Sequence, residues 1–419
     1  MSIDLHFVAE GTINLKPPCV IDMCSYIKTK RIAIVETIPA VCSTKILNRD
    51  LIGEDLQSVL RPFNFMQNVF MCAKYSICNN IVSANSCFYN LIGMFCLILY
   101  HGIYFHHIMS LFIKFYKGDL PYHFVLNLIN VFDYFAYLSG DLINSVSHIA
   151  HSCFNIQLVL KIHHMFKVLG MNTDKLRIYT VQNWICVILV NLSIVSFIIF
   201  YYLTSVDISI VEVITSYASL SYDVNILYAL FMTKLIEKCL RLLIERVDNS
   251  RNPYINVQYE DFYTTLFDVY LDIFESYKIV ERTFRQMPTL LVMFFLLFQI
   301  AFYTIFTAYL CLRNVIMYVL LPLASLIWNW KNVILLIWLS VECERFYSAI
   351  KDAQCACNMM MRSRICSETR FSKNILRVQR AQFKKMSVYG LLCVDATLPL
   401  KLSSFITFHT IVCLQFAYL

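Results

Sequence analysis

Residues 389–419 read YGLLCVDATLPLKLSSFITFHTIVCLQFAYL, and this stretch decides the fold class of the chain. One carboxylate, Asp395, follows the basic pair Lys384 and Lys385, and from Leu400 onward the sequence is almost wholly apolar. A helix of about 20 residues, rising 1.5 Å per residue, is long enough to cross the hydrocarbon core of a bilayer. We therefore expect a membrane-spanning terminal helix over residues 400–419.

Several polar residues interrupt this apolar helix, which indicates that one side of it does not face lipid. They are Lys401, Ser403, Ser404, Thr407, His409, Thr410 and Gln415. Polar side chains at this density need protein or water as partners, because hydrocarbon offers none. Two interpretations remain open: packing against another helix through small residues and hydroxyl hydrogen bonds, or a face that lines water.

The composition of the whole chain predicts a membrane protein. Hydrophobic residues make up 58% of the 419 residues and charged residues only 15%, which is outside the range of soluble domains. The net charge of +7 is dispersed among apolar segments, so it does not indicate a nucleic-acid partner. Residues 1–40 lack the pattern of a cleaved signal peptide, and we expect insertion through internal helices.

The hydropathy pattern predicts an all-α membrane protein with seven transmembrane helices. An apolar stretch at residues 56–78 contains too many polar residues to span and predicts an interfacial helix. The expected crossings are residues 87–105, 123–144, 184–203, 208–232, 290–311, 319–341 and 400–419.

Charge asymmetry predicts the orientation of these crossings. With the amino terminus inside, the segments on that side carry 30 of the 35 Lys and Arg residues, so the carboxy terminus is expected outside. Amphipathic stretches on the inner side predict cytosolic helical extensions that form an anchor domain. They are residues 234–247, 259–285, 344–361 and 373–386. The expected domains are residues 1–86 (cytosolic segment), 87–343 (six crossings with extensions), 344–388 (anchor helices) and 389–419 (terminal helix).

The terminal stretch also carries a family resemblance. Gly390, Asp395, Gln415 and Phe416 occur in the order and at the separations of the carboxy-terminal signature of the insect gustatory receptor family, which this chain resembles. The Thr-Tyr pair of that signature is replaced by Phe408 and His409. The length, the number of predicted helices and the orientation agree with the same family.

The resemblance implies a ligand-gated, non-selective cation channel in the plasma membrane of gustatory neurons. Its ligands would be small tastants, including bitter or plant-derived compounds, and it would assemble as a homo- or hetero-tetramer with other gustatory receptors. Terminal helices would line the pore for monovalent and divalent cations, with Gln415 and Phe416 at the constriction and Thr407 and Ile411 below it. Lys401 would oppose cation flow, so we expect it to turn toward Asp395 or lipid headgroups.

Polar residues with aromatic neighbours predict a ligand pocket among the second to sixth crossings. The carboxylates Asp133 and Asp223 need a partner or water inside a membrane, and Lys331 could pair with either. An interfacial aromatic belt is the alternative interpretation of the neighbouring tyrosines. The candidate ligand-binding residues are Asp133, Tyr137, Tyr222, Asp223, Tyr303, Trp328 and Trp330.

Two other function classes compete with the channel. A metabotropic receptor of inverted topology fits the same predicted crossings. A histidine-rich membrane enzyme is suggested by clusters such as His106–His107 and His163–His164, but these are expected on opposite sides of the membrane and cannot form one metal site. We therefore expect no enzyme activity, no metal and no cofactor.

Overall fold

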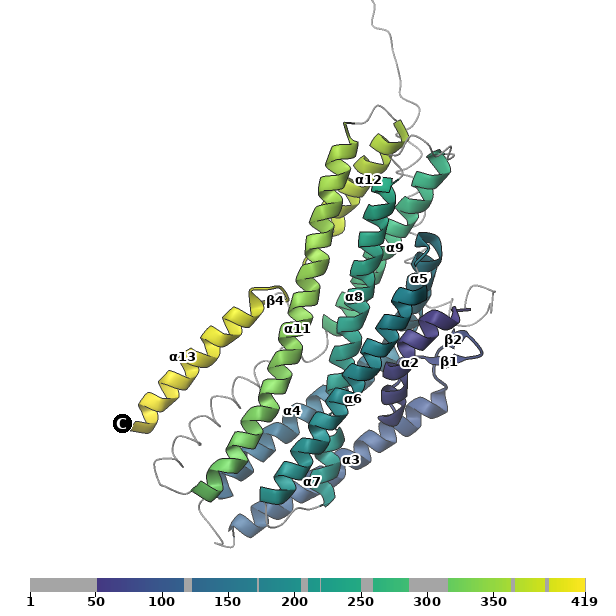
Figure 1. The fold of residues 1–419 in the computed structure, drawn as a ribbon. Coiled ribbons are helices and arrows are strands. Elements are labelled where there is room, and N and C mark those ends of the chain that lie inside the picture. The colour runs from purple at the N-terminus through teal and green to yellow at the C-terminus, as the bar shows by residue number, and fades with distance from the viewer. Residues whose placement is uncertain are drawn as a thin grey trace, which may run out of the picture. The chain divides into compact units, whose positions relative to one another are not determined.

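The structure is a computed structural model that describes residues 51–116, 123–171, 173–204, 210–218, 220–249, 259–285, 316–362, 366–388 and 392–418. The chain divides into two units, Met1–Arg49 and Asp50–Leu419, and the described residues belong to the second. Most of them are helical (Figure 1), which confirms the all-α class. The helices are α2 (Glu54–Val69), α3 (Cys87–Tyr116), α4 (His123–Ala150), α5 (Ser152–Leu169), α6 (Thr173–Thr204), α7 (Ile210–Ala218), α8 (Leu220–Asn249), α9 (Tyr259–Arg285), α11 (Ile316–Met360), α12 (Cys366–Gln382) and α13 (Leu398–Tyr418). The strands are β1 (Ser76–Cys78), β2 (Ile81–Ser83), β3 (Ser387–Val388) and β4 (Leu392–Cys393).

Two of the described helices are long and apolar enough to cross a membrane. They contain the segments Cys87–Ser110 of α3 and Leu176–Ile199 of α6. Only 11% and 17% of their most apolar windows are buried, so the rest of the described chain does not cover these side chains. Both coincide with predicted crossings. The predicted crossing at residues 290–311 lies outside the described residues, and the count of seven stays a prediction.

Two helices cover the described part of the fourth predicted crossing, residues 208–232. Helix α7 ends at Ala218 and α8 begins at Leu220, and residue 219 between them lies outside the described residues. From there α8 continues without interruption to Asn249, so the predicted inner extension at residues 234–247 belongs to the same helix. The sixth predicted crossing behaves similarly, since α11 joins residues 319–341 and the extension at residues 344–360 in one helix of 45 residues.

The helices predicted as inner extensions pack against one another within the chain. Helix α9 contacts α5, α8 and α12, and α11 contacts α8 and α12. On the α5 side, Lys161 Nζ lies 2.6 Å from Asp272 Oδ1 and 2.7 Å from Glu275 Oε2 on α9. The range predicted for α9 is confirmed. Helix α12 begins seven residues earlier than the predicted residues 373–386, and Met386 lies beyond its end.

The predicted interfacial helix at residues 56–78 was too long. Helix α2 ends at Val69, Met71 adopts a φ of 52°, and residues 76–83 form a β1–β2 hairpin. Asn79 and Asn80 turn this hairpin with φ values of 51° and 65°, as a two-residue type I′ turn requires. The apolar side of α2, which includes Val59, packs mainly against α6. The stretch is thus a helix, a loop and a hairpin, because the αL residue and the Asn-Asn turn end the helical pattern.

Candidate functional site

A buried ion pair joins two of the predicted ligand-pocket helices. Asp223 at the start of α8 pairs with Lys331 on α11, and the side chain of Asp223 is only 2% exposed. The sequence left Lys331 open as a partner of either Asp133 or Asp223, and the structure pairs it with Asp223. A buried carboxylate without this ammonium would be costly, so the pair ties α8 to α11 where they pack together.

A second buried polar group lies between α3, α4 and α8. His101 Nε2 lies 3.2 Å from Asp141 Oδ2, and Ser221 Oγ donates to Asp141 Oδ1 at 3.2 Å. The ring of Tyr134 covers His101, with 5.9 Å between ring centroids. The sequence pattern did not predict this contact between His101 and Asp141. Two polar residues on consecutive crossings were the available signal, but their pairing depends on how α3 and α4 pack.

The remaining predicted ligand residues are only partly located. Asp133 and Tyr137 lie on α4, Tyr222 on α8, and Trp328 and Trp330 on α11, but their side chains are outside the described residues. Tyr303 is outside them altogether. Of the seven candidates, Asp223 is therefore the one whose contacts are described, and the pocket stays a prediction.

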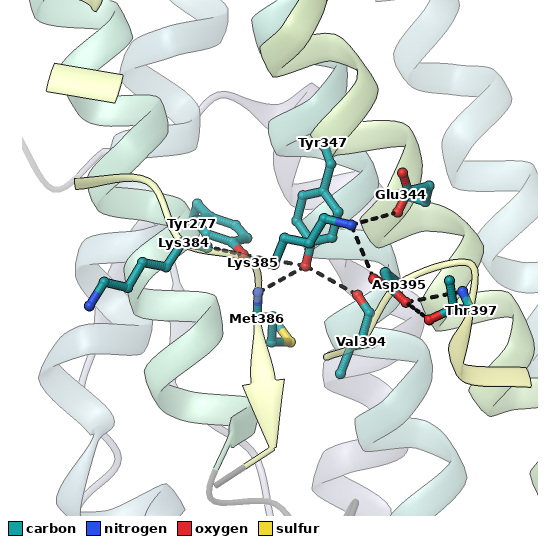
Figure 2. A network of polar contacts seen from close by, with 9 residues as sticks. All are labelled: Tyr277, Glu344, Tyr347, Lys384, Lys385, Met386, Val394, Asp395 and Thr397. Atoms are coloured by element: carbon teal, nitrogen blue, oxygen red, sulfur yellow. Dashed lines mark hydrogen bonds and ion pairs between the residues drawn. The ribbon is translucent and has the colours of Figure 1, made fainter. Parts of the chain in front are cut away.

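A network of hydrogen bonds connects α11 to the base of α13 through one tyrosine (Figure 2). The hydroxyl of Tyr347, which is 1% exposed, accepts the backbone N–H of Met386 at 2.9 Å and donates to the carbonyl of Val394 at 3.2 Å. Beside it, the Tyr277 hydroxyl of α9 donates to the Lys384 carbonyl at 3.0 Å. Burial raises the pKa of both hydroxyls, which keeps them protonated as donors. Two helices thus hold both ends of the short β3–β4 segment that precedes α13.

An ion pair fixes the first turn of α13 beside this network. Lys385 Nζ lies 3.0 Å from Asp395 Oδ2 and 3.5 Å from Glu344 Oε2 on α11 (Figure 2). Asp395 Oδ1 also accepts the backbone N–H of Thr397 at 3.0 Å and its hydroxyl at 2.6 Å. This is an Asx turn, which starts the helix that follows. Lys401 was expected to turn toward Asp395 or toward lipid headgroups. The Asp395 carboxylate contacts Lys385 and Thr397 instead, and Lys401 is exposed, so the headgroup alternative stays a prediction.

The pH dependence of this ion pair can be predicted. Hydrogen bonds from Thr397, with Lys385, lower the pKa of Asp395 to about 2. A depressed carboxyl pKa stabilises the fold above its ordinary value of about 3.9, and the contribution is lost as the pH falls through the lowered value. Asp395→Ala should therefore cost about 1–2 kcal/mol of stability, constant from about pH 8 to pH 5, by thermal unfolding of the purified protein.

The matched variant Asp395→Asn separates the two contributions. It keeps an acceptor for the Asx turn and loses only the charge, so its cost should stay below about 1 kcal/mol because the ion pair is partly exposed. A stability difference between wild type and Asp395→Ala that shrinks between pH 7 and pH 5 would contradict this assignment.

Helix α13 leaves its own polar side chains largely uncovered. Thr407, Gln415 and Ile411 are exposed, the last with 51% of its surface accessible, and α13 packs mainly against α11. The side chain of Phe416 is outside the described residues. A helix that exposes apolar and polar side chains together needs a further covering surface, whether lipid, a second copy or both.

No family model and no curated protein matches the chain. Among the described residues, no group of three or more His, Cys, Asp or Glu side chains could hold a metal ion. The histidines have separate contacts there: His101 bonds to Asp141, and His164 Nδ1 lies 3.0 Å from Asp272 Oδ2.

Proposed function

We propose that the chain is a subunit of a ligand-gated, non-selective cation channel of the gustatory receptor type. One observation carries the proposal: α13 exposes Thr407, Ile411 and Gln415, which the described remainder of the chain does not cover. These residues include the polar end of the signature through which the sequence resembles gustatory receptors. A polar stripe on an otherwise apolar helix is suited to line water at a shared axis.

In the proposed assembly, four copies place their terminal helices around one pore. Seven crossings per copy, with the amino terminus inside, put Gln415 and Phe416 near the outer mouth and Thr407 and Ile411 deeper. The channel would sit in the plasma membrane of gustatory neurons and pass monovalent and divalent cations. Homomers and heteromers with other receptors of the type are both compatible with this arrangement.

The proposed ligand is a small tastant held among the second to sixth crossings. Occupation of the pocket would favour the arrangement in which terminal helices splay, as a shift between two existing states. The Asp223–Lys331 pair supports this role, since it joins α8 to α11 near the predicted pocket. Helix α11 then leads to Tyr347, whose hydroxyl contacts both ends of the segment before α13.

Replacing Gln415 tests the pore role directly. Gln415→Ala should change the cation selectivity or the ligand sensitivity of the evoked current. A side chain at the constriction contributes unequally to the free energies of the open and closed states. If the substitution removes about 1 kcal/mol of stabilisation from the open or the closed state, the ratio of open to closed channels changes about fivefold. The measurement is the ligand-evoked current of cells challenged with a tastant panel.

Leu400→Ala is the matched control, since it removes an exposed side chain from the opposite end of α13. It should leave selectivity unchanged. A current that disappears when G proteins are blocked, together with a mild effect of Gln415→Ala, would favour the metabotropic alternative and refute the channel.

A further inference from the structure

A loop inside the bundle carries a buried lysine. Residues 72–75, here named the buried loop, follow α2, and Ala73, Lys74 and Tyr75 are each no more than 1% exposed. The beginning of α3 holds the loop in place: Asn85 Nδ2 donates to the Ala73 carbonyl, and the Ala73 N–H donates to the Tyr89 hydroxyl at 3.4 Å. The backbone N–H and carbonyl of Ala73, the residue before Lys74, are therefore both held by hydrogen bonds.

The Lys74 ammonium has aromatic neighbours but no described counter-charge. Its Nζ lies 5.7 Å from the ring centroid of Tyr228 and 5.4 Å from that of Phe284. In the part of the chain that the structure describes, no carboxylate lies within ion-pair distance of it. The other inward-facing lysines differ, because Lys161 pairs with Asp272 and Lys331 with Asp223. Cation–π contacts offset only part of the free-energy cost of burying an ion.

The groups around Lys74 are neutral and can donate hydrogen bonds. His148 on α4 is 6% exposed, and neither of its ring nitrogens has a hydrogen-bond partner among the described residues. Burial first, and Lys74 second, lower the pKa of His148 to about 4, so the imidazole is neutral and keeps one N–H. Burial likewise raises the pKa of the Cys72 thiol to about 12 despite Lys74, and that of the Tyr75 hydroxyl, so both stay protonated.

A carboxylate that acts on this region, that of Asp141, is already engaged. Asp141 influences the Cys72 thiol, but its two oxygens contact Ser221 and His101. The charge of Lys74 thus remains uncompensated by described groups, while neighbouring donors remain available.

We propose that Lys74 and His148 form a binding site for a small monovalent anion within the bundle. The ammonium supplies one positive charge, the imidazole N–H supplies a hydrogen bond, and the rings of Tyr228 and Phe284 exclude water on one side. One negative charge balances one ammonium, whereas a dianion would leave a buried excess charge. Chloride and a small carboxylate share this chemistry, and the groups that would contact either anion come from the buried loop, α4, α8 and α9.

Thermal unfolding of the full-length protein in zwitterionic nanodiscs tests the site. Chloride or acetate replaces gluconate at constant ionic strength, because gluconate carries a single charge on a much larger molecule. At about pH 7 the unfolding midpoint should rise by a few °C with the logarithm of chloride or acetate concentration, since a ligand that binds only the folded state stabilises it. The ion with the lower half-maximal concentration identifies the preferred anion.

The ammonium must be protonated for binding, which gives a second readout. Burial lowers the pKa of Lys74 to about 8. The stabilisation by anion should therefore be full below that value and should fall away by about pH 10.

Variants separate the site from a general salt effect. Lys74→Met should abolish the dependence on anion, and His148→Leu should weaken apparent affinity about tenfold, as expected for one hydrogen bond to a charged group. Lys373→Met, an exposed lysine on α12, is the matched control and should keep the full dependence. Equal midpoints of wild type in chloride, acetate and gluconate would overturn the proposal, and so would a Lys74→Met protein that keeps the anion response. If Lys74→Met does not fold, the wild-type series and His148→Leu still decide.

Discussion

Lys331→Met should destabilise the protein by about 3–5 kcal/mol, the largest effect that we expect from a single substitution. The change removes the ammonium that faces Asp223 and leaves that carboxylate, 2% exposed, without its partner between α8 and α11. Because a lone buried charge keeps the full desolvation cost, the loss exceeds the net contribution of the intact pair. Thermal unfolding in nanodiscs measures it as a large fall of the midpoint.

A double substitution distinguishes the pair from a packing effect. Asp223→Asn removes the charge with little change of shape, so Asp223→Asn combined with Lys331→Met should recover most of the stability that Lys331→Met alone loses. Lys234→Met is the matched control on α8, since Lys234 contacts the exposed Gln182 side chain and the Tyr179 ring, and it should cost less than about 1 kcal/mol. If the stability losses of Asp223→Asn and Lys331→Met simply add in the double variant, the ion pair is not the cause of the loss in Lys331→Met.

Tyr347→Phe should give the second-largest effect. Phenylalanine fills the same space but leaves the Met386 N–H and the Val394 carbonyl without the hydroxyl that bonds both. Each buried backbone group left unpaired costs about 1–3 kcal/mol, so we expect a loss of at least about 2 kcal/mol in thermal unfolding. In the proposed channel, the same variant should also weaken the response to ligand, because the segment before α13 loses its attachment to α11.

Tyr270→Phe is a matched control for this substitution. Tyr270 on α9 is also buried, at 0% exposed, but its hydroxyl has no hydrogen-bond partner among the described residues. Removing it should therefore be neutral or slightly stabilising. An equal loss in Tyr270→Phe and Tyr347→Phe would show that the tyrosine ring, rather than the network of the Tyr347 hydroxyl, sets the stability there.

The helices that sequence periodicity predicted best are those with strong amphipathic patterns. Residues 259–285 were predicted as one helix, and α9 has these bounds, because its apolar positions recur at helical spacing. The end of α2 was missed because local backbone choices decide it: Met71 and the Asn79–Asn80 turn adopt positive φ. Hydrophobicity alone carries no signal for such a change of direction.

The candidate sites depended more strongly on tertiary packing. Asp223 and Lys331 were recognised as a possible pair, since an apolar segment makes isolated charges conspicuous. The network of Tyr347 was not anticipated, because its partners are backbone groups of residues 386 and 394 that no sequence pattern marks. Lys74 lies within residues 56–78, which were predicted as an interfacial helix, whereas the loop after α2 buries its side chain.

Helix α11 is one uninterrupted rod of 45 residues, about 67 Å long. The hydrocarbon core of a bilayer is only about 30 Å thick. In the proposed orientation a helix of this length therefore crosses the core and projects far out of the membrane on one side. If such a helix tilts as a rigid body about a fixed point, its two ends move in opposite directions. A ligand that displaces one end of α11 would thereby also displace Tyr347, and no series of side-chain rearrangements between the two would be needed.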